Sequence, residues 1–159
     1  MNKVVATVVI LASVVTLAFC FFIFYLYLTN RTVDQTLATD LTVLSEWTEI
    51  TPDPPLSKSR MIAELAIAIP DYDHDPSENI SGQWRLPDGR VVSPQIEAVD
   101  EAGNRILFRH SGFTMSRRDL IIYRPTPDLG SDTKLVKVRI RSDKHFQCEQ
   151  MFWRNRNMK

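Results

Sequence analysis

The feature that most constrains this chain is an apolar run near its N-terminus. From Val4 to Leu28 there is no charged residue, and only Thr7, Ser13 and Thr16 interrupt the hydrophobic sequence. An α-helix over these 25 residues would be about 37 Å long. The hydrocarbon core of a bilayer is roughly 30 Å thick. The run therefore predicts a transmembrane helix over residues 4–28.

A cysteine inside this run raises an alternative. Cys20, with Leu17 and Ala18 before it, resembles the lipobox at which bacterial lipoproteins are cleaved and lipidated. The resemblance departs at Phe19, where a small residue is expected, and eight apolar residues follow the cysteine. A cleaved secretory signal has a shorter apolar core and a small-residue cleavage site. We therefore expect a retained signal-anchor helix.

The residues that flank the run suggest its orientation. Residues 1–3 form a short tail with the N-terminal amine and Lys3, and Arg31 is the one basic residue close to the other end. Lysine and arginine counts decide little here, so the very short tail favours a cytoplasmic N-terminus. We expect a single-pass protein whose bulk is extracytoplasmic and whose first partner is the lipid bilayer.

Residues 29–56 are expected to form a juxtamembrane helix and a proline-rich linker. Apolar residues recur at helical spacings of three and four, at Val33, Leu37, Leu41, Leu44, Trp47 and Ile50. The sequence TPDPPL at 51–56 then breaks the helix, because proline cannot continue it.

The remaining residues, 57–159, predict a separate β-rich domain. Its first stretch, SKSRMIAELAIAIP, is ambiguous, and its helix-favouring composition suggests a short helix that ends before Pro70. From Ile80 onward, short apolar runs alternate with turn signals. In KLVKVRIRS at 134–142, apolar and basic residues alternate from Val136 to Arg141, so Val136, Val138 and Ile140 are expected on one face of a strand. We expect an antiparallel β-sandwich or small barrel of six to seven strands, with one or two short helices.

Charge is unevenly distributed along the chain, although the formal net charge is zero. Residues 32–103 contain four basic and 14 acidic residues, whereas residues 104–159 contain 13 basic and five acidic residues. One interpretation is that the two halves face each other within one fold. The other is a basic surface for an anionic partner.

An acidic segment suggests a weak metal site. The sequence DYDHDPSEN places four carboxylates close together, at Asp71, Asp73, Asp75 and Glu78. Oxygen ligands of this kind suit a hard cation such as Ca²⁺. An EF-hand would need glycine at its sixth position and glutamate at its twelfth, and the segment has neither. A solvated acidic loop is the alternative.

Catalytic motifs are absent from the sequence. His74, His110 and His145 are far apart and do not show metal-ligand spacing. There is no nucleophile elbow, Walker loop or dinucleotide-binding glycine motif. We expect no cofactor and no catalytic activity, and the two cysteines, Cys20 and Cys148, cannot form a disulfide framework.

The basic C-terminal part of the chain contains the residues that we expect to contact a partner. Basic side chains accompanied by aromatic ones suit an anionic surface, and the candidates are Lys137, Arg139, Arg141, Trp153 and Arg154. An extracytoplasmic location excludes nucleic acid as the partner, so we expect a protein or an anionic component of the envelope.

These observations together predict a membrane-anchored, non-catalytic binding or assembly module. Two alternatives remain: a membrane-bound hydrolase with an unrecognised site, and an envelope sensor that binds an ion or ligand through the acidic loop 71–78.

Overall fold

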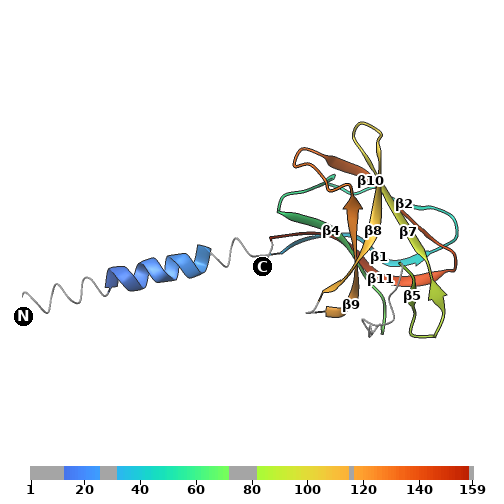
Figure 1. Ribbon diagram of the computed structural model, residues 1–159, viewed down its shortest axis with the longest axis horizontal. Helices are drawn as coiled ribbons and strands as arrows, with labels where there is room; N and C mark the ends of the chain where they lie inside the picture. Colours follow the sequence, from blue (N-terminus) through green and yellow to red (C-terminus); the bar gives the residue numbers. More distant parts are fainter. Residues whose placement is uncertain (1–12, 26–31, 72–81, 115–116, 158–159) are drawn as a thin grey trace, which may run out of the picture.

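The computed structural model describes residues 13–25, 32–71, 82–114 and 117–157. Apart from an α-helix over residues 13–25, the described regular structure consists of β-strands (Figure 1). The strands are β1 (Val33–Val43), β2 (Thr48–Ile50), β3 (Leu56–Ser57), β4 (Ile62–Ala68), β5 (Trp84–Arg85), β6 (Val91–Val92), β7 (Pro94–Asp100), β8 (Arg105–Thr114), β9 (Arg117–Thr126), β10 (Lys134–Ser142) and β11 (Phe146–Arg156).

Most of these strands belong to one antiparallel sheet that curls into a nearly closed barrel. The strand order is β1-β11-β4-β9-β8-β7-β10-β2, with β3 also paired to β10 and with β5 and β6 forming a separate small hairpin. β1 and β2 are consecutive in the chain, yet they lie at opposite ends of this strand order. The short segment 44–47 between them therefore brings the two ends of the sheet together.

The interior of the barrel is filled by apolar side chains from all the long strands. Trp84 lies within 5.6 Å of Tyr123 and 5.4 Å of Phe146, measured between ring centroids. Trp153 makes an edge contact with Phe108. These aromatic side chains are almost fully buried, as are the aliphatic residues around them. This packed core fixes which side chains of each strand face outward.

A second, smaller apolar cluster lies on the other face of β4, β9 and β11. It consists of Ala66, Ala68, Leu120, Ile122 and Phe152. β4 is therefore buried on both faces. This explains why the short helix expected before Pro70 is wrong: with both faces apolar, the strand lacks the polar alternation that identifies a strand.

The helix predicted over the start of residues 29–56 is also wrong, because this segment forms β1 and β2. β1 has a register shift between Thr36 and Ala38, and Asp40 has a positive φ of 50°. An extra residue disrupts strict alternation in a strand. Residues four apart, such as Leu37 and Leu41, share a face in a strand as well as in a helix, so their spacing imitates a helical stripe. β1, β2 and β3 belong to the same sheet as the later strands.

The predicted transmembrane helix over residues 4–28 is wrong for the part of that segment that the structure describes. The helix over residues 13–25 is only about 20 Å long at 1.5 Å per residue. No helix within the described ranges is both long and apolar enough to cross a membrane. Residues 4–12 and 26–28 lie outside the described residues. The single-pass membrane location and signal anchor, which depended on that helix, are corrected with it.

The separation of charge along the chain is balanced within the fold. Seven of the nine ion pairs among the described residues join an acidic residue of the first half to a basic residue of the second. Examples are Arg154 with Asp34 and Lys137 with Glu49. The two halves therefore face each other across paired strands.

Candidate binding surface on the outer face of the sheet

The basic residues of β10, which the sequence offers as partner contacts, are bound within the sheet. Lys137 Nζ lies 2.9 Å from Glu49 Oε2. Arg139 forms ion pairs with Glu97 and Glu49. Arg141 donates two hydrogen bonds to Gln95. The charges of Lys137 and Arg139 are therefore offset by glutamates within the fold, whereas the Arg141 side chain is held by a neutral amide.

The two predicted contact residues of β11 are also occupied by the fold. Trp153 is 1% exposed, and its Nε1 donates a hydrogen bond of 2.9 Å to the carbonyl of Ser57. Arg154 forms a bidentate pair with Asp34 and lies over the ring of Phe152. Trp153 is a core residue, and Arg154 ties β11 to β1.

The predicted metal site falls largely outside the described residues. Of its four carboxylates, only Asp71 is described, and it is exposed with a φ of 54°. Asp73, Asp75 and Glu78 are not described. Among the described residues, no three His, Cys, Asp or Glu side chains are grouped so that they could hold a metal ion.

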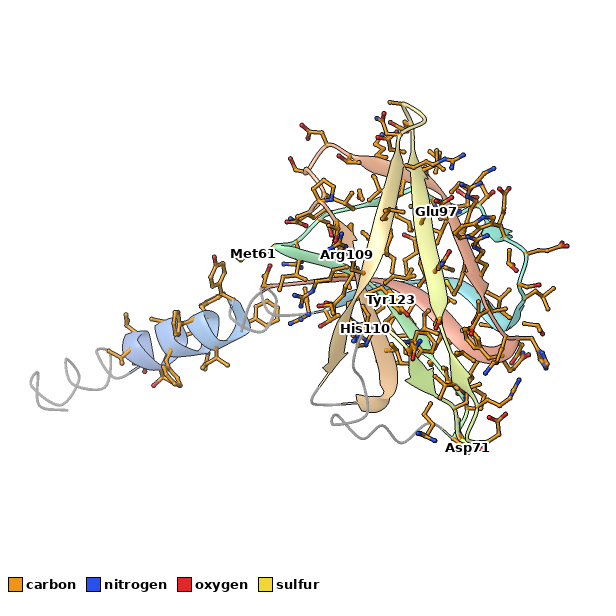
Figure 2. All side chains as sticks on the ribbon, turned by 45° about the vertical axis from the view of Figure 1, so that its right-hand side comes forward. Met61, Asp71, Glu97, Arg109, His110 and Tyr123 are labelled. Carbon is orange, nitrogen blue, oxygen red and sulfur yellow. The ribbon has the colours of Figure 1, made fainter. Side chains whose placement is uncertain are left out.

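The described histidines do not assemble a catalytic group. His110 packs edge-on against Tyr123 of the neighbouring strand, and Figure 2 shows the two side chains close together. His145 lines a surface pocket of about 530 Å³ together with Ser45 and Asp143. Asp143 Oδ1 accepts hydrogen bonds from the Ser93 amide and the Ser142 hydroxyl, and no hydrogen bond or ion pair joins Asp143 to His145 in the described structure. His74 lies outside the described residues.

Cys148 is chemically inert in the folded protein. The side chain is buried in the main core, and this burial raises the pKa of its thiol to about 12. Because the thiolate is the reactive form of cysteine, Cys148 is a packing residue and not a nucleophile.

The surface that remains available lies on the outer face of β8. Phe108 and Ile106 pack inward on the core, so the alternate residues point outward. Arg105, Leu107 and Arg109 are exposed, and Leu107 is 55% exposed. Neither Arg105 nor Arg109 forms a hydrogen bond or ion pair with any part of the chain that the structure describes.

A neighbouring arginine on β9 extends this surface. Arg109 lies directly opposite Arg124 in the register of β8 and β9. Like charges directly opposite each other on a sheet destabilise it. We call the surface formed by Arg105, Leu107, Arg109 and Arg124 the arginine face; Figure 2 shows Arg109 on β8.

A buried glutamate lies beside the arginine face. The Glu64 side chain on β4 is fully buried. It accepts a hydrogen bond of 2.9 Å from Arg156 Nε and longer ones of 3.4 and 3.5 Å from Arg124. Burial of a carboxylate requires such partners. The pairing to Arg124 is long, and Arg109 has no carboxylate of its own in the described structure.

Sequence reasoning missed the arginine face, although part of its signal is in the sequence. RILFR at 105–109 alternates outward arginine and leucine with inward apolar residues. The opposition of Arg109 and Arg124 depends on the strand register, which includes a shift between His110 and Gly112. That register cannot be derived from the local pattern.

Comparisons of the chain with protein-family models, with curated proteins and with solved structures found no match in any of the three. The geometry of the chain itself therefore bears on its function.

Proposed function

We propose that this protein is a non-catalytic binding module that docks an acidic segment of a protein partner on the arginine face. The observation that carries the proposal is the pair of exposed arginines without described partners, Arg105 and Arg109, on either side of an exposed leucine. Lys137 and Arg139 of β10 support it by contrast, because they already form ion pairs with Glu49 and Glu97 within the fold.

The chemistry of the surface suits a protein more than a small ion. An exposed leucine between cations offers an apolar contact surrounded by charged groups, which is a common composition of protein interfaces. Arginine is enriched among the residues that dominate binding energy. An acidic segment with one apolar side chain would suit this surface. Its apolar side chain would pack against Leu107, and its carboxylates would pair with the arginines.

The test uses a fluorescent peptide in which glutamate and leucine alternate, and a lysine–leucine peptide of the same length. We expect the full chain to bind the acidic peptide by fluorescence anisotropy, with an affinity that falls as salt is raised. Arg109→Glu should weaken this binding by about tenfold or more, because it replaces attraction with repulsion.

A matched variant supplies the control. Lys144→Glu makes the same change of charge at an exposed residue in the loop between β10 and β11, away from the arginine face, and should change the affinity less than about twofold. Equal binding of the two peptides, or equal effects of the two variants, would contradict the proposal.

A further inference from the structure

We infer that the group bound between Arg109 and Arg124 is a doubly charged phosphoryl group on the protein partner. This inference rests on the proposed function and specifies its ligand. It starts from the one like-charged pair on the arginine face whose members lie directly opposite each other.

The sheet register places Arg109 and Arg124 side by side on the outer face of the sheet. Directly opposite residues in an antiparallel pair have Cβ atoms about 4.5–5.5 Å apart, and both arginines are exposed. Each guanidinium presents N–H donors in a planar fork, which matches carboxylate and phosphate oxygens. One oxyanion with several acceptor oxygens can therefore receive hydrogen bonds from both forks.

Charge counting favours two negative charges over one. Arg109 lies opposite Arg124, Arg124 shares the carboxylate of Glu64 with Arg156, and these four side chains form one group. The group carries a net charge of +2. A single carboxylate would neutralise half of it, whereas a phosphoryl group at neutral pH carries close to two negative charges and three strong acceptor oxygens.

Glu64 also determines which donors remain available. It engages Nε and Nη2 of Arg124, which leaves Nη1 for a ligand. Arg109 is not engaged by any described residue, so its whole fork is available. The buried carboxylate of Glu64 holds Arg124 in place, and the ligand accepts hydrogen bonds from the donors of Arg124 that Glu64 does not engage.

The experiment compares three versions of one acidic peptide that contains a central serine: unmodified, phosphorylated, and with aspartate at that position. We expect the full chain to bind the phosphorylated peptide about tenfold more tightly than either of the others, as hydrogen bonds between charged groups imply. Isothermal titration calorimetry measures all three affinities.

Two single substitutions on β8 test whether Arg109 causes the preference for the phosphorylated peptide. Arg109→Ala should abolish the preference for the phosphorylated peptide. Arg105→Ala removes another exposed arginine of β8, one that lies opposite Val99 instead of an arginine, and should weaken the binding of all three peptides equally. A phosphate preference that survives Arg109→Ala would overturn the inference.

The other outcomes of the experiment separate the phosphoryl inference from the proposed function, and a phosphorylated peptide from other anionic ligands. Equal, Arg109-dependent binding of all three peptides would overturn the phosphoryl inference and leave the proposed function intact, whereas no binding of any peptide would overturn both. Inorganic phosphate or a single-stranded oligonucleotide that binds at Arg109 as tightly as the phosphopeptide would also overturn it, in favour of free phosphate or nucleic acid.

Discussion

At the scale of single residues, Glu64 is a buried carboxylate that joins β4 to the strands on both of its sides. Its carboxylate is fully buried on the outer face of β4, where it holds Arg124 and Arg156. Both arginines are partly exposed, so water can solvate them if the carboxylate is lost. Water cannot solvate the buried carboxylate of Glu64. The contribution of this residue to the free energy of unfolding therefore depends on both arginines.

Replacing this carboxylate by its neutral isostere should destabilise the protein. We expect Glu64→Gln to lower the free energy of unfolding by about 1–3 kcal/mol, because charge-assisted hydrogen bonds become ordinary ones and a buried amide is incompletely paired. Urea denaturation followed by circular dichroism measures the change.

The control for Glu64 is another glutamate with an ion pair at the surface. Glu101→Gln removes an exposed carboxylate that lies 3.7 Å from Lys134, and exposed pairs of this kind contribute little. We expect a change below about 0.5 kcal/mol. Equal costs for the two variants would show that the burial of Glu64 adds nothing.

At the scale of elements, the corner between β1 and β2 closes the barrel. Trp47 lies in this corner, and the guanidinium carbons of Arg139 and Arg141 are 5.2 and 4.6 Å from the centre of its ring. Arginine over a tryptophan face is a favourable cation–π contact. Trp47 therefore fastens the corner to β10.

Removing the ring should loosen this closure. We expect Trp47→Ala to lower the free energy of unfolding by about 1–2 kcal/mol, from the loss of two cation–π contacts and of packing. Leu44→Ala changes a half-exposed residue in the same segment and should cost less than about 0.5 kcal/mol. Thermal denaturation compares the two, and the opposite ranking would show that Trp47 does not fasten the corner.

The predictability of each strand depended on how its two faces are buried. β10 was predicted with the correct bounds because Val138 and Ile140 face the core while Arg139 and Arg141 face outward. Val136, expected on the same face, lies at a register shift between Leu135 and Lys137. The alternation of apolar and polar residues is visible in the sequence of a strand with one polar face, and a bulge reverses it locally.

The same physical limit applies to the candidate site. Local periodicity places Arg105, Leu107 and Arg109 on one side of a strand, and the sequence shows this much. It does not show that Lys137 and Arg139 are paired with Glu49 and Glu97, or that the arginines of β8 have no ion pair among the described residues. Those relations arise between segments far apart in the chain, and only the strand order defines them.

At the scale of the whole molecule, several carboxylates stabilise the fold only in their ionised form. Hydrogen bonds from Lys137, Arg90, Asn104 and Ser93 lower the pKa values of Glu49, Asp88, Asp100 and Asp143, respectively. A lowered pKa in the folded state adds stability above the unfolded pKa, and this stability is lost as the pH falls toward the folded value.

We therefore expect the urea midpoint to stay nearly constant between about pH 7 and 5, and to fall below about pH 4. Asp100→Asn should make this fall shallower, because one of the contributing carboxylates is gone. Glu46→Gln, at an exposed residue without a described partner, should leave the slope unchanged. An equal slope in all three proteins would contradict this account.

The position of β11 determines when the fold can be completed during synthesis. β11 lies between β1 and β4, and its residue Asn155 pairs with Val33. Until the ribosome has released β11, each of these two earlier strands has an unpaired edge that invites wrong pairing. A fold that joins strands so distant in the chain also forms slowly, so the nascent protein depends on β11 for protection against aggregation.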